Sequence, residues 1–75
     1  MRYLILFEKG ETSYGAYIPD LPGYVDVGET LEEVRTLIRE ALALHLQDMR
    51  ATGQQIPEAS TVSEYVDVLQ TPDAA

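Results

Sequence analysis

The residues best suited to chemistry are thirteen acidic side chains and one histidine. A two-metal nuclease needs several carboxylates that converge on ions about 3.5 to 4 Å apart, and the candidate ligands are Asp20, Asp26, Glu33 and Asp48. Glu33 has a capping role at a helix start, Asp20 lies in a turn that aspartate favours, and the spacing does not bring the other two together. We therefore expect no metal site, no catalytic residue and no cofactor.

His45 is the only histidine, and it lies within the apolar stripe of a predicted helix. An isolated imidazole with neither a cysteine nor a second histidine makes a poor metal site. The simpler interpretation is a neutral ring, hydrogen-bonded at the edge of the core, which Asp48 could orient. The chain has no cysteine, and this excludes disulfides, thiolate metal sites and thiol catalysis.

The acidic residues outnumber the basic ones by thirteen to five, which gives a formal charge of -8. Such a field repels nucleic-acid backbones and favours basic partners. A phosphate loop is also excluded, because no lysine follows Gly23 or Gly28 and the next helix begins with two glutamates. The longest apolar run, residues 3–7, is far shorter than the roughly 20 residues of a membrane span. We expect a cytoplasmic protein that binds another protein.

Hydropathy and turn residues predict the elements that position these side chains. Three strands are expected at residues 2–8, 13–18 and 24–27. Residues 64–69 alternate enough to predict a fourth strand, and residues 70–75 are expected to fray.

One long helix is predicted between the third and fourth strands. Thr30 and Glu33 have the spacing of a capping box, and Gly53 is a natural C-terminal stop. We interpret these three residues and His45 as structural. The order β-β-β-α-β predicts an α+β fold, with a mainly antiparallel sheet and the helix on one face. A chain of 75 residues has room for one domain, which we assign to residues 1–75.

Two elements carry more apolar surface than this fold can bury. The apolar residues of the helix form an arc of about 200°, roughly twice what packing on a sheet needs. In the first strand Tyr3, Ile5 and Phe7 point one way while Leu4 and Leu6 point the other. One helix covers only one sheet face. A wide core half-covered by loops would explain both observations, but we favour an interface that forms a homodimer or a higher oligomer.

Tyrosines make up five of the six aromatic residues. Tyrosine is amphipathic and common at protein interfaces, so we expect several tyrosines on the sheet face away from the helix. A base-stacking platform would need basic neighbours, whereas these neighbours are acidic. The predicted interface residues are Tyr3, Ile5, Phe7, Tyr14, Tyr17, Asp20, Tyr24 and Asp26.

Residues 14–33 contain a proline turn that ends in Pro-Gly and a Gly-x-Thr helix start. This stretch resembles the signature of HicB-type antitoxin domains, also known as the UPF0150 group. The match continues through residues 40–42 to Gly53 and the Ile-Pro pair at 56–57, and it covers about two thirds of the chain.

The resemblance implies a partial ribonuclease-H-like fold and self-association as a dimer or tetramer. It also implies neutralisation of a small basic HicA-type toxin, an RNase that cleaves messenger RNA, by masking its RNA site without turnover. The acidic charge agrees with such a partner, because complementary charges speed encounter. Many family members carry a C-terminal DNA-binding domain; we expect a stand-alone domain without one and no DNA-binding autoregulation. The ribonuclease-H carboxylate set does not occur in this sequence.

Two other functions stay open on the sequence alone. An orphan homo-oligomeric scaffold or small-ligand-binding protein would self-associate without a toxin partner, and no basic reading frame would lie beside its gene. A residual metal-dependent nuclease would degrade RNA or DNA in the presence of Mg²⁺ or Mn²⁺.

Overall fold

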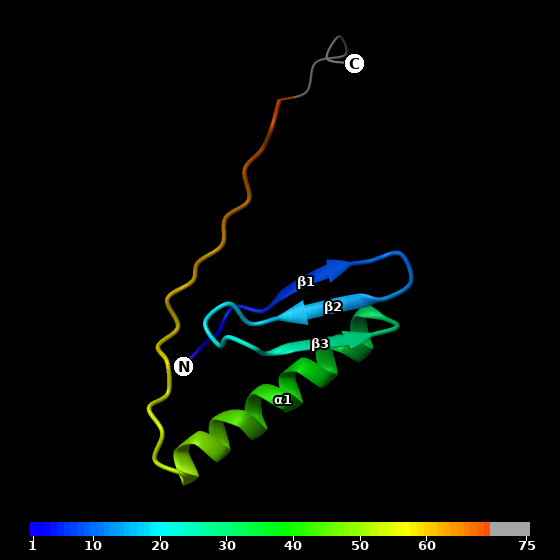
Figure 1. Ribbon diagram of the computed structural model, residues 1–75. Helices are drawn as coiled ribbons and strands as arrows, with labels where there is room; N and C mark the ends of the chain where they lie inside the picture. The colour runs from blue at the N-terminus through cyan, green and yellow to red at the C-terminus, as the bar shows by residue number, and fades with distance from the viewer. Residues whose placement is uncertain (70–75) are drawn as a thin grey trace.

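The computed structural model describes residues 1–69 as three strands followed by one helix. The elements are β1 (Leu6–Lys9), β2 (Tyr14–Tyr17), β3 (Val25–Gly28) and α1 (Leu31–Ala51). The sheet is antiparallel with the order β1-β2-β3, and Figure 1 shows α1 crossing one of its faces. The predicted α+β class, antiparallel sheet and single covering helix are therefore confirmed. The fraying predicted for residues 70–75 concerns a part of the chain outside the described residues.

The first strand is shorter than predicted, because the ladder begins only at Leu6. The register pairs Leu6 with Tyr17, so a longer β1 would set Leu4 opposite Pro19. Proline has no N–H to donate and ends a ladder of backbone hydrogen bonds. The same proline that opens the following turn therefore also limits β1.

Two successive turns connect β2 to β3. The Leu21 N–H donates to the Ile18 carbonyl at 3.0 Å, and the Tyr24 N–H donates to the Leu21 carbonyl at 3.2 Å. Gly23 has a φ of 87°, the left-handed conformation required at the third position of a type II turn, here preceded by proline. These turns bring the buried Leu21 side chain back against the core.

Both predicted ends of the helix are confirmed. The Thr30 side chain accepts a hydrogen bond from the Glu33 N–H at 3.1 Å, which is one of the two bonds of a capping box. At the other end the Gln54 N–H donates to the Met49 carbonyl at 2.9 Å, and Gly53 has a φ of 72°. This is a Schellman motif, in which glycine adopts the left-handed conformation without steric cost.

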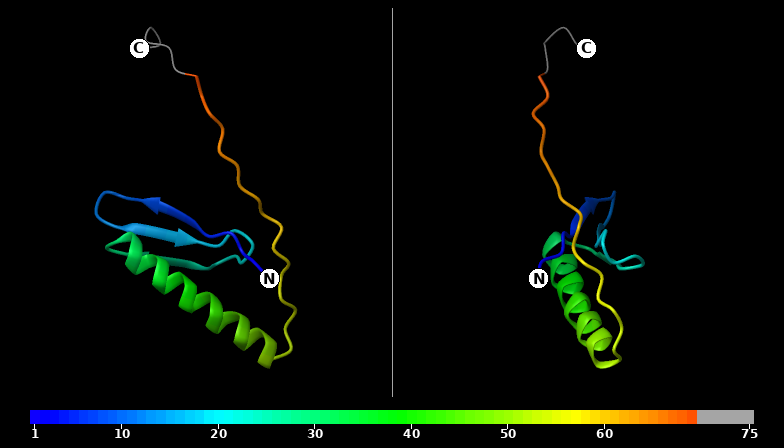
Figure 2. Two further views of the ribbon diagram at one scale, coloured as in Figure 1. Left: turned by 180° about the vertical axis from the view of Figure 1, so that it is seen from behind. Right: turned by 90° about the vertical axis from the view of Figure 1, so that its left-hand side faces the viewer.

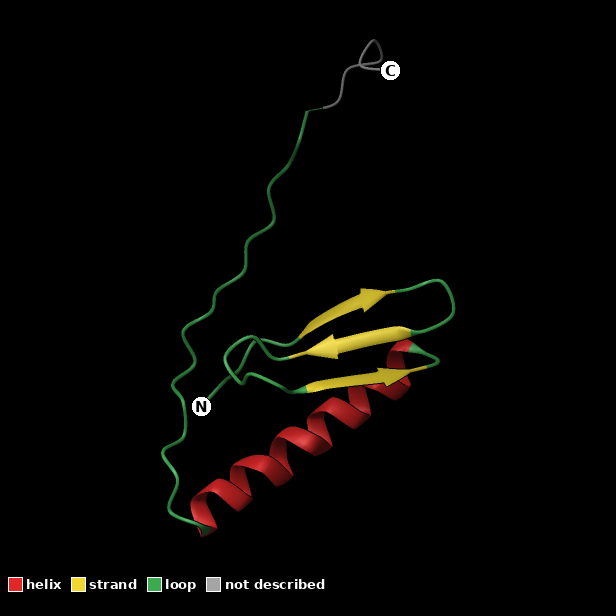
Figure 3. Ribbon diagram, viewed as in Figure 1, coloured by secondary structure: helices red, strands yellow, loops and turns green. Residues whose placement is uncertain are grey.

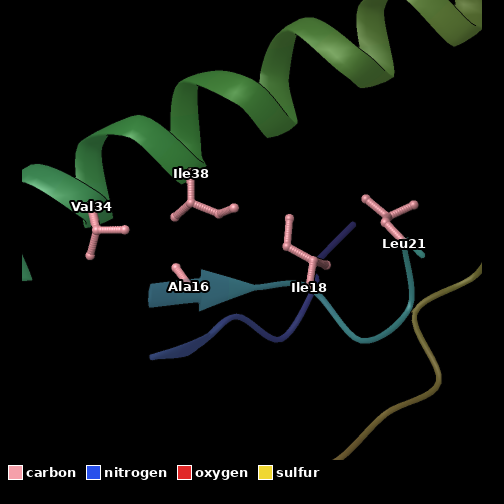
Figure 4. Packing of buried hydrophobic residues seen from close by; sticks show 5 residues of the cluster. All are labelled: Ala16, Ile18, Leu21, Val34 and Ile38. Atoms are coloured by element: carbon pink, nitrogen blue, oxygen red, sulfur yellow. The ribbon is translucent and has the colours of Figure 1, made fainter. Parts of the chain in front are cut away.

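The core lies between the sheet and α1 and comprises Ala16, Ile18, Leu21, Val34 and Ile38 (Figure 4). Val34 and Ile38 have no exposed area, and each fully buried aliphatic side chain contributes about 1.5 to 3 kcal/mol. At one end the backbone of β3 comes very close to the helix. A Cβ added at Gly28 would lie 3.0 Å from the Val34 nitrogen, so this contact depends on glycine.

The prediction of a fourth strand is wrong for this structure, since residues 64–69 are extended but belong to no sheet. Tyr65 and Leu69 are 102% and 91% exposed, and Figures 2 and 3 show the chain after α1 running past the sheet and away from it. The alternating side chains favour a strand, but a strand also needs a neighbour for its backbone groups. Among the described residues these positions have no such neighbour.

Candidate functional site

The body of the protein, residues 1–53, leaves the sheet face opposite α1 uncovered. Side chains aligned across an antiparallel register share a face, and one aligned row contains Leu6, Tyr17 and Val25. The next row adds Val27, beside a glycine. Val25 and Val27 are 65% and 61% exposed. We call these four apolar residues and Glu8, which shares the second row, the outer sheet face.

Tyrosines occupy this face less than predicted. Tyr17 lies on it, but Tyr3, Tyr14 and Tyr24 pack against the core on the helix side. The Tyr24 hydroxyl also donates to the Ala41 carbonyl at 3.4 Å. The expectation that several tyrosines line the face away from the helix is therefore wrong. Both faces of the predicted first strand, residues 2–8, are apolar in sequence, and the pattern alone does not tell which one the helix covers.

The remaining predicted interface residues of the sheet also lie on the helix side. Ile5 packs against the core, and Asp26 is aligned with the buried Ala16. Phe7 is aligned with the same alanine, and the Arg35 guanidinium lies 5.8 Å from its ring centroid, within range of a cation–π contact. The interface role of Ile5, Phe7 and Asp26 stays a prediction. Val25 and Val27, which are exposed on the outer sheet face, were not among the predicted interface residues. Their exposure could be recognised only from the register.

His45 is half-buried, and its ring packs on Tyr24 with 4.4 Å between the centroids and 50° between the planes. This contact gives the histidine a packing role between α1 and the start of β3. The hydrogen bond expected of this ring, and its orientation by Asp48, stay predictions. Within residues 1–69 no three histidine, cysteine or carboxylate residues are grouped so that they could hold a metal ion.

Asp20 makes a set of contacts that the sequence did not indicate. Its carboxylate accepts hydrogen bonds from the backbone N–H groups of Ser60 and Thr61, at 3.2 and 3.1 Å, and from their hydroxyls, at 3.1 and 2.7 Å. We call these three residues the Asp20 clamp. The hydrogen bonds from Thr61, followed by those from Ser60, hold the pKa of Asp20 below its ordinary value of 3.8. The clamp joins the β2–β3 turn to the chain beyond α1.

The chain is strongly acidic as a whole, with a formal charge of -8. Residues 54–69 contain three acidic residues, Glu58, Glu64 and Asp67, and no lysine or arginine. Glu32 and Glu33 are exposed in the first turn of α1. An apolar face on an acidic protein is suited to a partner with complementary positive charge. Separately, no helix in the described part of the chain combines the length and apolar character that crossing a bilayer requires.

Comparison with known sequences relates this chain to a family of bacterial antitoxins. The family model of the HicB-like antitoxins of bacterial toxin-antitoxin systems matches residues 3–74. Antitoxin HicB 2 of Photorhabdus laumondii is 33% identical over 69 residues, which cover 91% of this chain and 50% of that protein. A 14.9 kDa protein from the rep-hol intergenic region of Haemophilus phage HP1 is 30% identical over 67 residues, 89% of this chain and 50% of the phage protein.

A UPF0150 protein of Synechocystis is 31% identical over 68 residues, 89% of this chain and 86% of its own length. The chain thus spans about half the length of the phage protein and of the Photorhabdus antitoxin. No solved structure shows a significant match. Since the family model covers nearly all of the sequence, and the relatives include both an antitoxin and UPF0150 proteins, the chain belongs to the HicB-like antitoxin family of bacterial toxin-antitoxin systems.

Proposed function

We propose that this chain is the toxin-binding module of an antitoxin, and that it neutralises a small basic HicA-type RNase by covering the toxin's RNA-binding site. Membership of the HicB-like family is the observation that carries the proposal. The module acts by binding alone and turns over no substrate.

The outer sheet face is the surface we assign to the toxin. This face presents two valines that are more than half exposed, and the protein as a whole has a formal charge of -8. A toxin that binds RNA must carry positive charge where the phosphates lie. An acidic protein with an apolar centre competes for that site, because charge steers the encounter and apolar burial slows dissociation.

Self-association belongs to the same proposal. The outer sheet face and the chain beyond α1 both leave apolar side chains exposed, and one bound toxin does not cover both. We propose a homodimer as the basic unit, in the cytoplasm where a messenger-RNA-cleaving toxin acts, and a partial ribonuclease-H-like arrangement of its sheet.

The test is co-expression with the product of the adjacent gene, which this proposal expects to be a small basic protein, followed by binding and RNA-cleavage assays with the purified partner. The double substitution Val25→Lys and Val27→Lys places two positive charges on the outer sheet face without disturbing the core. We expect it to weaken toxin binding at least tenfold, about 1.4 kcal/mol, and to restore RNA cleavage. Leu44→Lys is the matched control, because Leu44 is 67% exposed on α1.

Equal inhibition by the wild type and the double variant would refute the outer sheet face as the toxin site. Failure of the wild-type protein to bind or inhibit the neighbouring gene product would refute the antitoxin function. High salt is expected to slow association of the wild-type pair, because it screens the charges that steer the encounter.

A further inference from the structure

Gly15 lies in the central strand on the outer sheet face, opposite α1 (Figure 1). The register aligns it with Glu8 on β1 and with Val27 on β3. Paired strands are about 4.8 Å apart, so Glu8 and Val27 stand roughly 10 Å from each other across β2. Glycine places no side chain between them. This row of the outer sheet face therefore has a gap at its centre, and the Gly15 backbone forms the floor of the gap.

The fold itself does not require a glycine at this position. A Cβ added at Gly15 would lie 4.0 Å from its nearest neighbour, the Asp26 carbonyl oxygen, which is an ordinary van der Waals distance. Positive φ values occur only at Gly23 and Gly53 among the glycines, all of which lie within residues 1–69. A glycine inside a strand is destabilising, and it often marks a place where another molecule approaches closely.

The side chains around the gap suit a lysine or an arginine. Glu8 is exposed on one side of the gap, and Val27 is 61% exposed on the other. Basic side chains have an apolar stem and a charged end. The stem fits over the Gly15 backbone beside the valine, and the charged end fits the carboxylate of Glu8. Tyr17, the next residue of β2 on this face, adds an aromatic ring of the kind that attracts cations.

The strands supply no positive charge of their own to this face. The strand residues that share it are Leu6, Glu8, Gly15, Tyr17, Val25 and Val27. None of them is basic, so the Glu8 carboxylate has no partner of opposite charge within its own face of the sheet. Complementary charge across an interface selects the partner and fixes its register.

We propose that Gly15 and Glu8 form a recognition site for one lysine or arginine side chain of the toxin, whose stem lies over Gly15 and whose charge pairs with Glu8. A basic side chain held in this way no longer faces an RNA phosphate, so the site contributes to inhibition. This inference rests on the proposed toxin binding by the outer sheet face and names the residues that recognise the partner.

The first test fills the gap with Gly15→Val. Valine favours strands and its Cβ has room, so the variant should be at least as stable to urea as the wild type. Its binding to the purified product of the adjacent gene should weaken by about tenfold or more in a calorimetric titration, because the new side chain occupies the gap. Apolar burial alone predicts the reverse, since valine enlarges the apolar face.

The matched control for added bulk is Ala43→Leu. It adds as many carbon atoms as Gly15→Val, at an exposed position of α1 on the other side of the sheet. This variant should bind like the wild type. A comparable loss of binding by the control would overturn the recognition site, and so would a Gly15→Val protein less stable than the wild type, since the glycine would then serve the fold.

The second test asks whether one side chain uses both residues. Glu8→Gln removes the charge and keeps the size, and it should weaken binding about fivefold or more. Glu11→Gln, between β1 and β2, is the matched control for the lost charge. The double variant, Gly15→Val with Glu8→Gln, should bind no more weakly than Gly15→Val alone, because the blocked side chain no longer reaches Glu8. Additive losses would overturn recognition of a single side chain.

The remaining outcomes separate this inference from the proposed function. Equal binding by the wild type and Gly15→Val would overturn the recognition site and leave the antitoxin function standing. Failure of the wild-type protein to bind the adjacent gene product would overturn the antitoxin function, and the recognition site with it.

Discussion

The body of the protein, residues 1–53, and the extended segment, residues 54–69, contain similar side chains in opposite environments. Val34 in α1 is fully buried, while Val66 in the extended segment is 75% exposed. The body has a second layer to pack against, because α1 covers one face of the sheet (Figure 1). The extended segment is held by polar contacts at its start. Apolar residues therefore stabilise this fold only where another element of the chain supplies the opposing surface.

The largest loss of stability should come from a substitution at the centre of the core. Ile38→Ala removes a side chain with no exposed area, and it should lower the free energy of unfolding by about 2 to 5 kcal/mol. Urea unfolding followed by circular dichroism measures this. Leu44→Ala on the same helix removes a side chain that is 67% exposed and should change stability by less than about 0.5 kcal/mol. Equal losses for both variants would contradict the assigned core.

A smaller loss is expected where β3 approaches α1. In Gly28→Ala the new Cβ would lie 3.0 Å from the Val34 nitrogen, a backbone atom held by the first turn of the helix. We expect a loss of about 1 to 3 kcal/mol from overpacking. Gly15→Ala is the control in the neighbouring strand, because the nearest atom to its Cβ is 4.0 Å away. A Gly28→Ala protein as stable as the control would show that the helix start can shift.

The next prediction concerns the docking of the extended segment on the body. Tyr3→Phe removes the hydroxyl that donates to the Pro57 carbonyl, and one such bond contributes about 0.5 to 1.5 kcal/mol. Amide hydrogen exchange should accelerate in residues 58–61 while exchange in α1 changes little. Tyr65→Phe, at a side chain that is 102% exposed, should leave both rates unchanged. Faster exchange throughout α1 would instead show that the Tyr3 hydroxyl mainly stabilises the core and not the docking of the extended segment.

The smallest effect is the pH dependence of the Asp20 clamp. Its hydrogen bonds lower the pKa of Asp20 from 3.8, so the folded state favours the ionised carboxylate. The clamp should be complete above this pH and should be lost as the pH falls through the lowered value. Amide chemical shifts of Ser60 and Thr61 would report the transition, and Asp20→Asn should abolish it. A midpoint above 3.8 would contradict the clamp.

Sequence patterns among neighbouring residues predicted the sheet and the helix of the body well. The helix ends at Thr30 and Gly53 and the turn at Gly23 depend on neighbouring residues, whose chemistry is visible in sequence. The antiparallel sheet followed from short strands joined by turns. Pro19, which shortens β1, acts across the register, and its effect required the pairing of β1 with β2.

The site was harder to predict, because its features join distant parts of the chain. Asp20 meets Ser60 and Thr61 forty or more residues away, and no periodicity marks such a contact. The sheet face that α1 covers was ambiguous, since residues 2–8 of the sequence are apolar on both sides of a strand. The fourth strand failed for a related reason: residues 64–69 carry the pattern of a strand, and pairing depends on a neighbour that the pattern does not specify.

The order of the sheet has a consequence for how quickly the body forms. Each strand pairs with the strand next to it in the chain, and α1 follows β3 after only a short connection. Folding of the body therefore requires no long loop to close, and because folding rates fall as contacting residues become more distant in sequence, the body should fold fast for a mixed α/β domain. We expect each newly synthesised body to be complete before it meets a partner.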